Sequence, residues 1–277
     1  MTPLTFTLIA FAISILAGVL GSLLGLGGGI IVIPALTMLL HIDIRYAIGA
    51  SIVSVIATSS GAAAAYVQEG MTNLRVAMLL EIATTCGALT GAYLAGMLNG
   101  RVLYIVFGIV MLYSAIAMFR GRRETVEDVP PDGVADRLAL HGSYFDKSLG
   151  REVTYRVTRT RLGFVLMYAA GVVSGLLGIG SGSLKVPAMD LAMRIPIKVS
   201  TATSNFMIGV TAAASAGIYF SRGDIDPFVA APVACGVMLG AMLGSHLLSR
   251  LKSTLIRGVF VVVLIWVSIQ MLLKGIL

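Results

Sequence analysis

Lys185 is the one charged residue in the stretch "GLLGIGSGSLKVP", residues 175–187, where almost every neighbour is apolar or very small. Within a membrane segment a charge costs at least about 2.5 kcal/mol on insertion scales, so such residues commonly mark a pathway or have a paired partner. A cation at this point would attract an oxyanion. The alternative is structural, with the side chain reaching the membrane surface or pairing with Asp190.

The small residues before this lysine offer a second kind of chemistry. They let the backbone leave helical geometry and approach a ligand closely. The segments that follow, starting near Ile30 and Leu184, would then point helix N-termini at an anion. Pro34 and Pro187 are expected early in these segments, where a missing N–H costs little. The alternative is that the glycines serve only helix packing. The substrate-binding residues predicted from this twice-occurring pattern are Gly27, Gly28, Gly29, Gly180, Ser181, Gly182, Ser183 and Lys185.

Hydroxyl and amide groups follow the second glycine run in "TATSNF". Thr203, Ser204 and Asn205 could donate hydrogen bonds to an oxyanion without adding charge, and Ser51 lies at the matching place after the first run. Serine and threonine in membrane helices also bond their own backbone, which is the competing interpretation. These four residues complete the predicted substrate site.

Two titratable residues inside apolar runs could move protons. Glu81 lies in "MLLEIATT" and His246 in "GSHLLS", and either could couple anion movement to a proton gradient. Each could equally be a structural hydrogen bonder. Tyr66 and Tyr219 fall at matching span ends, a position typical of an aromatic belt at the membrane surface.

The composition places the chain in a lipid bilayer. Of 277 residues, 57% are hydrophobic and 12% are charged, and the mean hydropathy is +0.95. Soluble domains typically carry about 25% charged residues. The net charge of +7 forms no continuous basic stripe, so nucleic acid is not an expected partner. Cys86 and Cys235 have no ligand partners in the sequence, and no metal or other cofactor is expected.

Apolar runs separated by short polar breaks indicate an all-α polytopic membrane protein. Two runs, residues 30–40 and 184–193, are shorter than the roughly 20 residues that cross a bilayer. Each follows a glycine-rich break, which predicts a re-entrant pair or a broken helix whose backbone is covered by protein or water. The first twenty residues are interpreted as a membrane helix and not as a cleaved leader.

Residues 120–161 form the long polar segment and hold nine of the twenty Lys and Arg residues. By the positive-inside rule this segment is cytoplasmic. Within it, "SYFDKSLGREVTYRV" alternates on both sides of a Ser-Leu-Gly break, which favours a small β-hairpin. The chain therefore divides into a first transmembrane repeat, a cytoplasmic linker and a second transmembrane repeat, with bounds 1–119, 120–161 and 162–277.

The two halves are similar in sequence. A shift of 153 residues places "AGVLGSLLGLGGGIIVIPAL" on "AGVVSGLLGIGSGSLKVPAM" without a gap. This predicts a duplicated membrane domain. If each broken pair crosses twice, the halves are inverted and Arg250, Lys252 and Arg257 fall inside; if each crosses once, the halves are parallel and these charges fall outside. The inverted arrangement is favoured. Paired broken segments at corresponding points are typical of a transporter substrate site.

With these residues in view, the chain resembles the sulfite exporter TauE/SafE family. The resemblance rests on "GLGGGIIVIPAL" and its echo "GIGSGSLKVPAM", each followed by a small or hydroxylated motif, "GAS" (49–51) or "ATSN" (202–205). It implies a multi-pass permease that exports small sulfur-containing anions such as sulfite, sulfonates or sulfoacetate. Ser181, Ser183 and Lys185 depart from the plain glycine pattern, and this departure bears on which anion is carried.

The sequence as a whole predicts a secondary transporter of the cell membrane that holds its anion between the repeats and works by alternating access. Its partners are the small anion, the lipid bilayer and, for coupling, protons; the sequence assigns no oligomeric state. An anion channel is one alternative. The other is an intramembrane hydrolase with Ser181 or Ser183 as nucleophile and His246 as base, against which the duplication argues.

Overall fold

The computed structural model describes residues 3–119, 131–248, 251 and 253–276. Arg250 and Lys252, on which the topology argument partly depended, lie outside the described residues. The chain is mostly helical, as expected. Its first half contains α1 (Pro3–Leu24), α2 (Gly29–Pro34), the π-helix η1 (Ala35–Leu39), α3 (Ile44–Gln68), α4 (Leu74–Ala95) and α5 (Gly100–Phe119).

The linker and the second half of the chain contain a hairpin and a further set of helices. The predicted hairpin is confirmed, with β1 and β2 paired antiparallel so that Gly142 faces Tyr155 and Asp146 faces Arg151. The remaining elements are α6 (Gly133–Arg137), β1 (Gly142–Asp146), β2 (Arg151–Tyr155), α7 (Thr160–Leu177), α8 (Gly182–Pro187), the π-helix η2 (Ala188–Ala192), α9 (Ile197–Ser221), α10 (Pro227–Leu248) and α11 (Ser253–Ile276).

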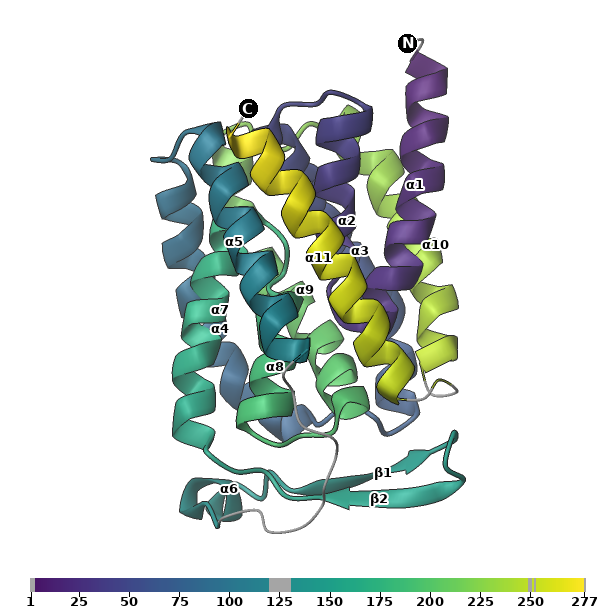
Figure 1. Ribbon diagram of the computed structural model, residues 1–277, viewed down its shortest axis with the longest axis vertical. Coiled ribbons are helices and arrows are strands. Elements are labelled where there is room, and N and C mark those ends of the chain that lie inside the picture. Colours follow the sequence, from purple (N-terminus) through teal and green to yellow (C-terminus); the bar gives the residue numbers. More distant parts are fainter. Residues whose placement is uncertain (1–2, 120–130, 249–250, 252, 277) are drawn as a thin grey trace.

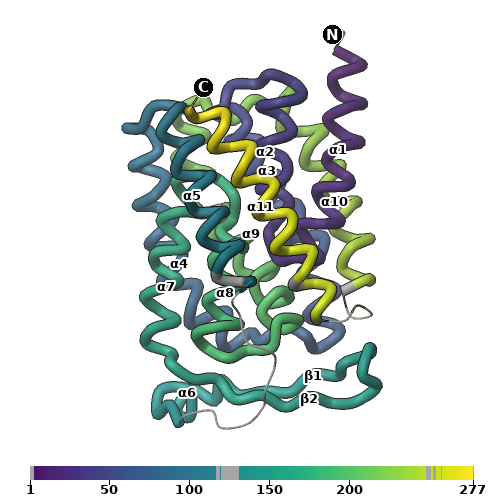
Figure 2. The backbone as a smooth tube through the Cα atoms, in the orientation of Figure 1, coloured from purple at the N-terminus to yellow at the C-terminus, as the bar shows by residue number. Residues whose placement is uncertain are grey.

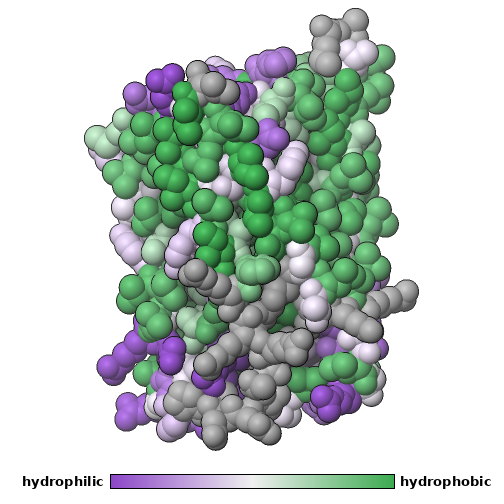
Figure 3. Space-filling view, in the orientation of Figure 1, coloured by the Kyte–Doolittle hydropathy of each residue, from purple (hydrophilic) through white to green (hydrophobic). Residues whose placement is uncertain are grey.

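Six of the described helices are long and apolar enough to cross a membrane: α1, α3, α4, α7, α10 and α11. The molecular surface agrees, since Figure 3 shows a broad apolar band between polar ends. Large apolar side chains such as Leu16, Met78, Val165 and Val262 are exposed around this band. In water such a surface would drive aggregation, whereas lipid solvates it. The protein is therefore a multi-pass membrane protein.

The chain reverses its direction at each of the two breaks. Figures 1 and 2 show α1 descending from the N-terminus at the top of the view and α7 rising from the hairpin at the bottom. η1 returns to the top, where Lys274 near the end of α11 donates to the Thr37 carbonyl. η2 returns to the hairpin end, where the Met193 carbonyl accepts from the Thr158 amide. Each break therefore joins two segments that run in opposite directions.

Proline explains the change of helix type after each break. Sequence reasoning places Pro34 and Pro187 early in the short segments, where a missing N–H costs little. The structure corrects this, because both are the last residues of α2 and α8 and both begin a turn of π-helix. A proline inside a helix cannot donate the i−4 bond and its ring crowds the preceding turn, so the backbone widens there.

The first helix of each half packs against a helix of the other half. α1 lies along α10, and α7 lies along α4. Glycines make the approach close: an added Cβ at Gly240 would overlap the carbonyl oxygen of Ile15, and one at Gly175 would overlap that of Ala88. Small residues at such crossings let backbones touch, which is how helices associate in lipid. The two halves are interlocked through these pairs.

Candidate functional site

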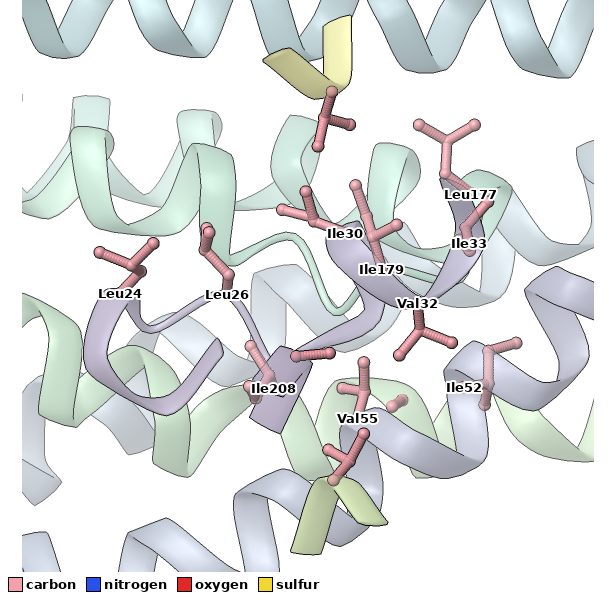
Figure 4. Close-up of a cluster of buried hydrophobic side chains, with 14 of the residues drawn as sticks. Leu24, Leu26, Ile30, Val32, Ile33, Ile52, Val55, Leu177, Ile179 and Ile208 are labelled. Atoms are coloured by element: carbon pink, nitrogen blue, oxygen red, sulfur yellow. The ribbon is translucent and has the colours of Figure 1, made fainter. Parts of the chain in front are cut away.

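The two glycine-rich breaks meet at the centre of the bundle. A Cβ at Gly182 would overlap the carbonyl oxygen of Gly25, so only glycine permits this contact. Ser181, which precedes α8, has a φ of 56°, a left-handed conformation that costs energy for a residue with a Cβ. Figure 4 shows apolar residues from both breaks, including Ile30 and Ile179, gathered in one cluster with Val55 and Ile208. The centre is therefore closed by backbone and apolar side chains.

Hydroxyl groups of α3 and α9 bond to the backbone of the two breaks, and two of these bonds connect the halves of the chain. Ser51 Oγ on α3 donates to the Gly178 carbonyl at 2.7 Å, and Ser204 Oγ on α9 donates to the Gly25 carbonyl at 2.8 Å. Thr58 Oγ1 donates to the Gly27 carbonyl at 3.0 Å. A broken helix leaves carbonyl groups without helical partners, and these bonds satisfy them. Ser51 and Ser204 therefore lie at the breaks, and both donate their hydroxyl protons to backbone carbonyls.

Two tyrosines have the same role, which corrects the aromatic-belt prediction. Tyr66 and Tyr219 are at most 1% exposed. The Tyr66 hydroxyl donates to the Ser22 carbonyl at 3.0 Å, and the Tyr219 hydroxyl donates to the Gly175 carbonyl at 2.7 Å. A buried tyrosine needs such a partner for its hydroxyl. The two residues bond to the ends of α1 and α7 in the protein interior, and they are not exposed to the membrane surface.

Several buried polar atoms around the breaks have no hydrogen-bond partner: Ser181 Oγ, Ser183 Oγ, Thr201 Oγ1 and Asn205 Oδ1. The amide nitrogen of Asn205 does have one, the Ser22 carbonyl at 2.7 Å. Leaving a buried polar atom unpaired costs roughly 1–3 kcal/mol, so unpaired groups in a closed core indicate a ligand or water that completes them. Three of these four residues belong to the predicted site, and Thr201 is added to it.

Lys185 and Glu81, predicted for different roles, lie together. Lys185 is fully buried and does not reach the membrane surface. Its Nζ donates to Thr211 Oγ1 at 2.6 Å and lies 3.9 Å from Glu81 Oε2. Thr211 Oγ1 lies 2.6 Å from Glu81 Oε1, which also accepts from Thr85 at 3.2 Å. The cation on α8 is thus neutralised by a carboxylate on α4 through a hydroxyl on α9.

Sequence reasoning missed Thr211, although a signal was present. Thr211 is the counterpart of Thr58 under the shift of 153 residues, and it lies one or two turns after "TATSNF" on the same helix. Helical spacing of three residues therefore places it beside Ile208 of the central cluster on α9. The Thr58 hydroxyl donates to the Gly27 carbonyl of the first break, whereas the Thr211 hydroxyl bonds to the ion pair.

Thr203 and His246 have other surroundings. Thr203 Oγ1 accepts from the Asn73 amide at 3.1 Å, so it holds the loop between α3 and α4. His246 is exposed on α10, and its Nδ1 lies 2.7 Å from the Met242 carbonyl of its own helix. The structure does not place His246 beside Ser181 or Ser183, as a hydrolytic dyad would require.

A small pocket opens at the end of the bundle opposite the hairpin. Its volume is about 100 Å³, and it is lined by Arg45, Ile48, Ala95, Gly96, Leu103, Tyr219, Arg222 and Asp224. Arg222 is held in place by Asp224 at 2.7 Å and lies over the Tyr219 ring. Ile48 packs against Gly178 of the second break. This pocket therefore lies directly above the break and carries two guanidinium groups.

Two glycine-broken helices that meet inside a bundle of apolar helices are typical of a membrane transporter. A family model described as "Sulfite exporter TauE/SafE" matches residues 10–271. The chain therefore belongs to the sulfite exporter TauE/SafE family.

The chain is similar to two probable membrane transporter proteins of Bacillus subtilis (strain 168). It is 28% identical to YunE over 275 residues, which covers 97% of this chain and 98% of that protein. It is 26% identical to YdhB over 222 residues, covering 80% and 82%. No solved structure matches the chain significantly.

Proposed function

We propose that the protein is a secondary transporter that exports small sulfur-containing anions, such as sulfite, sulfonates or sulfoacetate, by alternating access. The observation that carries the proposal is the presence of two buried hydroxyls without partners, Ser181 and Ser183, at the start of the same short helix as the buried cation Lys185. Hydroxyl donors and one cation suit a small oxyanion. The sulfur-containing substrate class follows from the family.

We further infer that the two halves are inverted repeats. α2 and α8 begin at Gly29 and Gly182, and α3 and α9 begin at Ile44 and Ile197; each pair is separated by 153 residues, the shift that aligns the sequences. α1 and α7 run in opposite directions (Figure 1). In such transporters one half rocks against the other and exposes a central site to each side in turn. The basic linker places the hairpin end in the cytoplasm.

The Lys185–Glu81 pair supplies a means of coupling. With Glu81 ionised, the pair is neutral and attracts an anion weakly. With Glu81 protonated, Lys185 is the uncompensated charge and an oxyanion can take the place of the carboxylate. Protonation of Glu81 and anion binding would then favour each other to the same extent. Glu81 therefore couples anion movement to protons in this proposal, with Thr211 between the two groups.

Counterflow in proteoliposomes tests the function. Unlabelled sulfite inside should accelerate uptake of radiolabelled sulfite, and sulfonates and sulfoacetate should compete while phosphate should not. Lys185→Gln should weaken the apparent affinity by a factor of roughly 10 to 100, since a charge-assisted hydrogen bond contributes about 1.5–3 kcal/mol. Saturable flux without counterflow would indicate a channel. Absence of flux from folded, inserted protein would remove the substrate proposal.

A further inference from the structure

The cytoplasmic hairpin places a carboxylate on a buried lysine of the membrane bundle. Asp146, the last residue of β1, is 3% exposed, and Lys198 in the first turn of α9 is 1% exposed. Asp146 Oδ1 lies 2.7 Å from Lys198 Nζ. Neither residue belongs to the central site. A buried ion pair between a linker and a membrane helix is costly to build unless both partners are well bonded, so its presence calls for an explanation.

The turn after β1 makes the contact with several bonds. Ser148 Oγ accepts from Lys198 at 3.0 Å and lies 2.6 Å from Asp146 Oδ1. The Ser148 amide donates to the same carboxylate oxygen at 2.8 Å. Beside it, Lys147 pairs with Glu69 at the end of α3 at 2.6 Å. The hairpin therefore presents a preorganised carboxylate to Lys198 and adds a second ion pair next to it.

The same hairpin closes its end of the bundle. Tyr144 and Tyr155 pack in one buried cluster with Leu80 of α4, Met193 and Val199. The Tyr155 hydroxyl and the Leu140 carbonyl both accept from Asn73 Nδ2, at 3.0 and 2.8 Å. Figure 1 shows the strands lying across the lower end of the helices. The hairpin is thus a cover over the ends of α4 and α9.

The opposite end of the bundle has residues equivalent to those beneath the hairpin, and they can be compared directly. Under the shift of 153 residues, Lys198 corresponds to Arg45 and Thr201 corresponds to Ile48. Arg45 and Ile48 line the open pocket of about 100 Å³ above the second break. Thr201 in turn lies against Gly25 of the first break, and its hydroxyl has no partner. A basic residue thus lies near each break. Arg45 lines an open pocket, whereas Lys198 is paired with Asp146.

We propose that Lys198 is a cytoplasmic binding site for a small oxyanion and that the hairpin carboxylate Asp146 occupies it in this closed state. The hairpin then acts as a built-in plug: an oxyanion arriving from the cytoplasm replaces the carboxylate on Lys198 and uncovers the way to Thr201 and the first break. This inference rests on the proposed transport of anions. Its test is chosen to be independent of transport.

The experiment measures access to a cysteine placed beneath the hairpin in the full-length purified protein. Thr201→Cys is introduced with Cys86→Ser and Cys235→Ser, and its labelling by a water-soluble, uncharged thiol reagent is timed. Asp146→Asn keeps an oxygen for the turn bond to Ser148 and removes only the charge. It should speed labelling roughly tenfold. Glu152→Gln, an exposed carboxylate on the same hairpin, is the matched control and should change nothing.

Oxyanion binding is read in the same assay. In the Asp146→Asn protein, sulfate or methanesulfonate, which do not react with the thiol reagent, should protect Thr201→Cys saturably, and Lys198→Gln should abolish that protection. Labelling that Asp146→Asn does not accelerate would overturn the plug. Acceleration without protection by either anion would overturn the anion site.

A milder variant guards against a folding defect. Ser148→Ala removes one acceptor of Lys198 while leaving both charges, and it should accelerate labelling by a smaller factor. If Asp146→Asn does not give a monodisperse protein, Ser148→Ala decides the question, and unchanged labelling in that variant counts against the plug. Because no step requires transport, a failed counterflow assay leaves these results interpretable, and the reverse also holds.

Discussion

The ammonium group of Lys185 and the carboxylate of Glu81 lie 3.9 Å apart in the core of the bundle, and Thr211 bridges them. The two residues come from different halves of the chain and are 104 positions apart in the sequence. Together they form a neutral unit where either alone would be a buried charge. This relationship ties the predicted substrate cation to the predicted proton carrier.

Removing one charge of this pair should destabilise the protein more than removing both. Lys185→Met leaves Glu81 buried without its counter-ion, a change that typically costs about 3–5 kcal/mol, and Glu81→Gln leaves the lysine in the same condition. The double variant should recover much of the loss. Thermal unfolding of the four purified proteins measures this as a double-mutant cycle. Additive losses would show that the two groups do not interact.

The unpartnered and the partnered serines should respond differently to alanine. Ser204→Ala removes the bond to the Gly25 carbonyl and should cost roughly 1–3 kcal/mol, because that carbonyl is left unsatisfied. Ser183→Ala removes a hydroxyl that has no partner, so stability should stay equal or rise while the apparent affinity for substrate falls several-fold. Unfolding and counterflow on both variants make the comparison. Equal destabilisation would remove Ser183 from the proposed site.

The contact between the breaks should not tolerate a methyl group. Gly182→Ala places a Cβ against the Gly25 carbonyl, and overpacking of this kind typically costs about 1–3 kcal/mol. Gly217→Ala, on an exposed face of α9 with open space around it, should be neutral or should stabilise by roughly 0.5–1 kcal/mol. The melting temperatures of the two variants distinguish these outcomes. An unchanged melting temperature for Gly182→Ala would mean that the breaks do not touch.

Docking of the hairpin should depend on pH only in the acid range. Burial alone would raise the pKa of Asp146, but bonds from Lys198 and Ser148 outweigh it and hold the pKa below its ordinary value. Arg151 across the strand pair adds positive charge near the group. The stabilisation is therefore complete above the ordinary carboxyl pKa of about 4 and is lost as the pH falls through the lowered value.

The labelling rate of Thr201→Cys, corrected for thiol ionisation, should accordingly be constant from pH 8 to pH 6 and should rise only under more acid conditions. A reagent whose intrinsic rate is measured on a free thiol at each pH supplies the correction. A rise between pH 8 and pH 6 would contradict the assignment of docking to Asp146, and the Asp146→Asn protein should be insensitive throughout.

Sequence reasoning located the breaks, the hairpin and the individual charged residues, because each leaves a local signal. A glycine run in an apolar segment marks a backbone that is not helical, and alternation about Ser-Leu-Gly marks two strands. The Lys185–Glu81 pairing left no such signal, since it depends on how α4, α8 and α9 cross. The same limit applies to Asp146 and Lys198, which meet across 52 positions.

The errors also have physical causes. Tyr66 and Tyr219 fit an aromatic belt by position, but a tyrosine is equally stable in a core when a carbonyl accepts from its hydroxyl, and only the tertiary structure supplies that carbonyl. Pro34 and Pro187 were expected at helix starts by their usual preference. The short helices begin instead at Gly29 and Gly182, where the glycine runs end.

The packing of α1 on α10 and of α7 on α4 has a consequence for biosynthesis. When α7 emerges from the ribosome, α4 is already made and can receive it at once. α1 has no such partner, because Pro227, the first residue of α10, follows Leu24 by 203 residues. The face of α1 that packs on α10 therefore lacks this partner until synthesis is almost finished. If the chain were cut in the linker, neither fragment would contain the helix that packs against its own first helix. The first fragment would contain α4, which packs against α7, and the second would contain α10, which packs against α1.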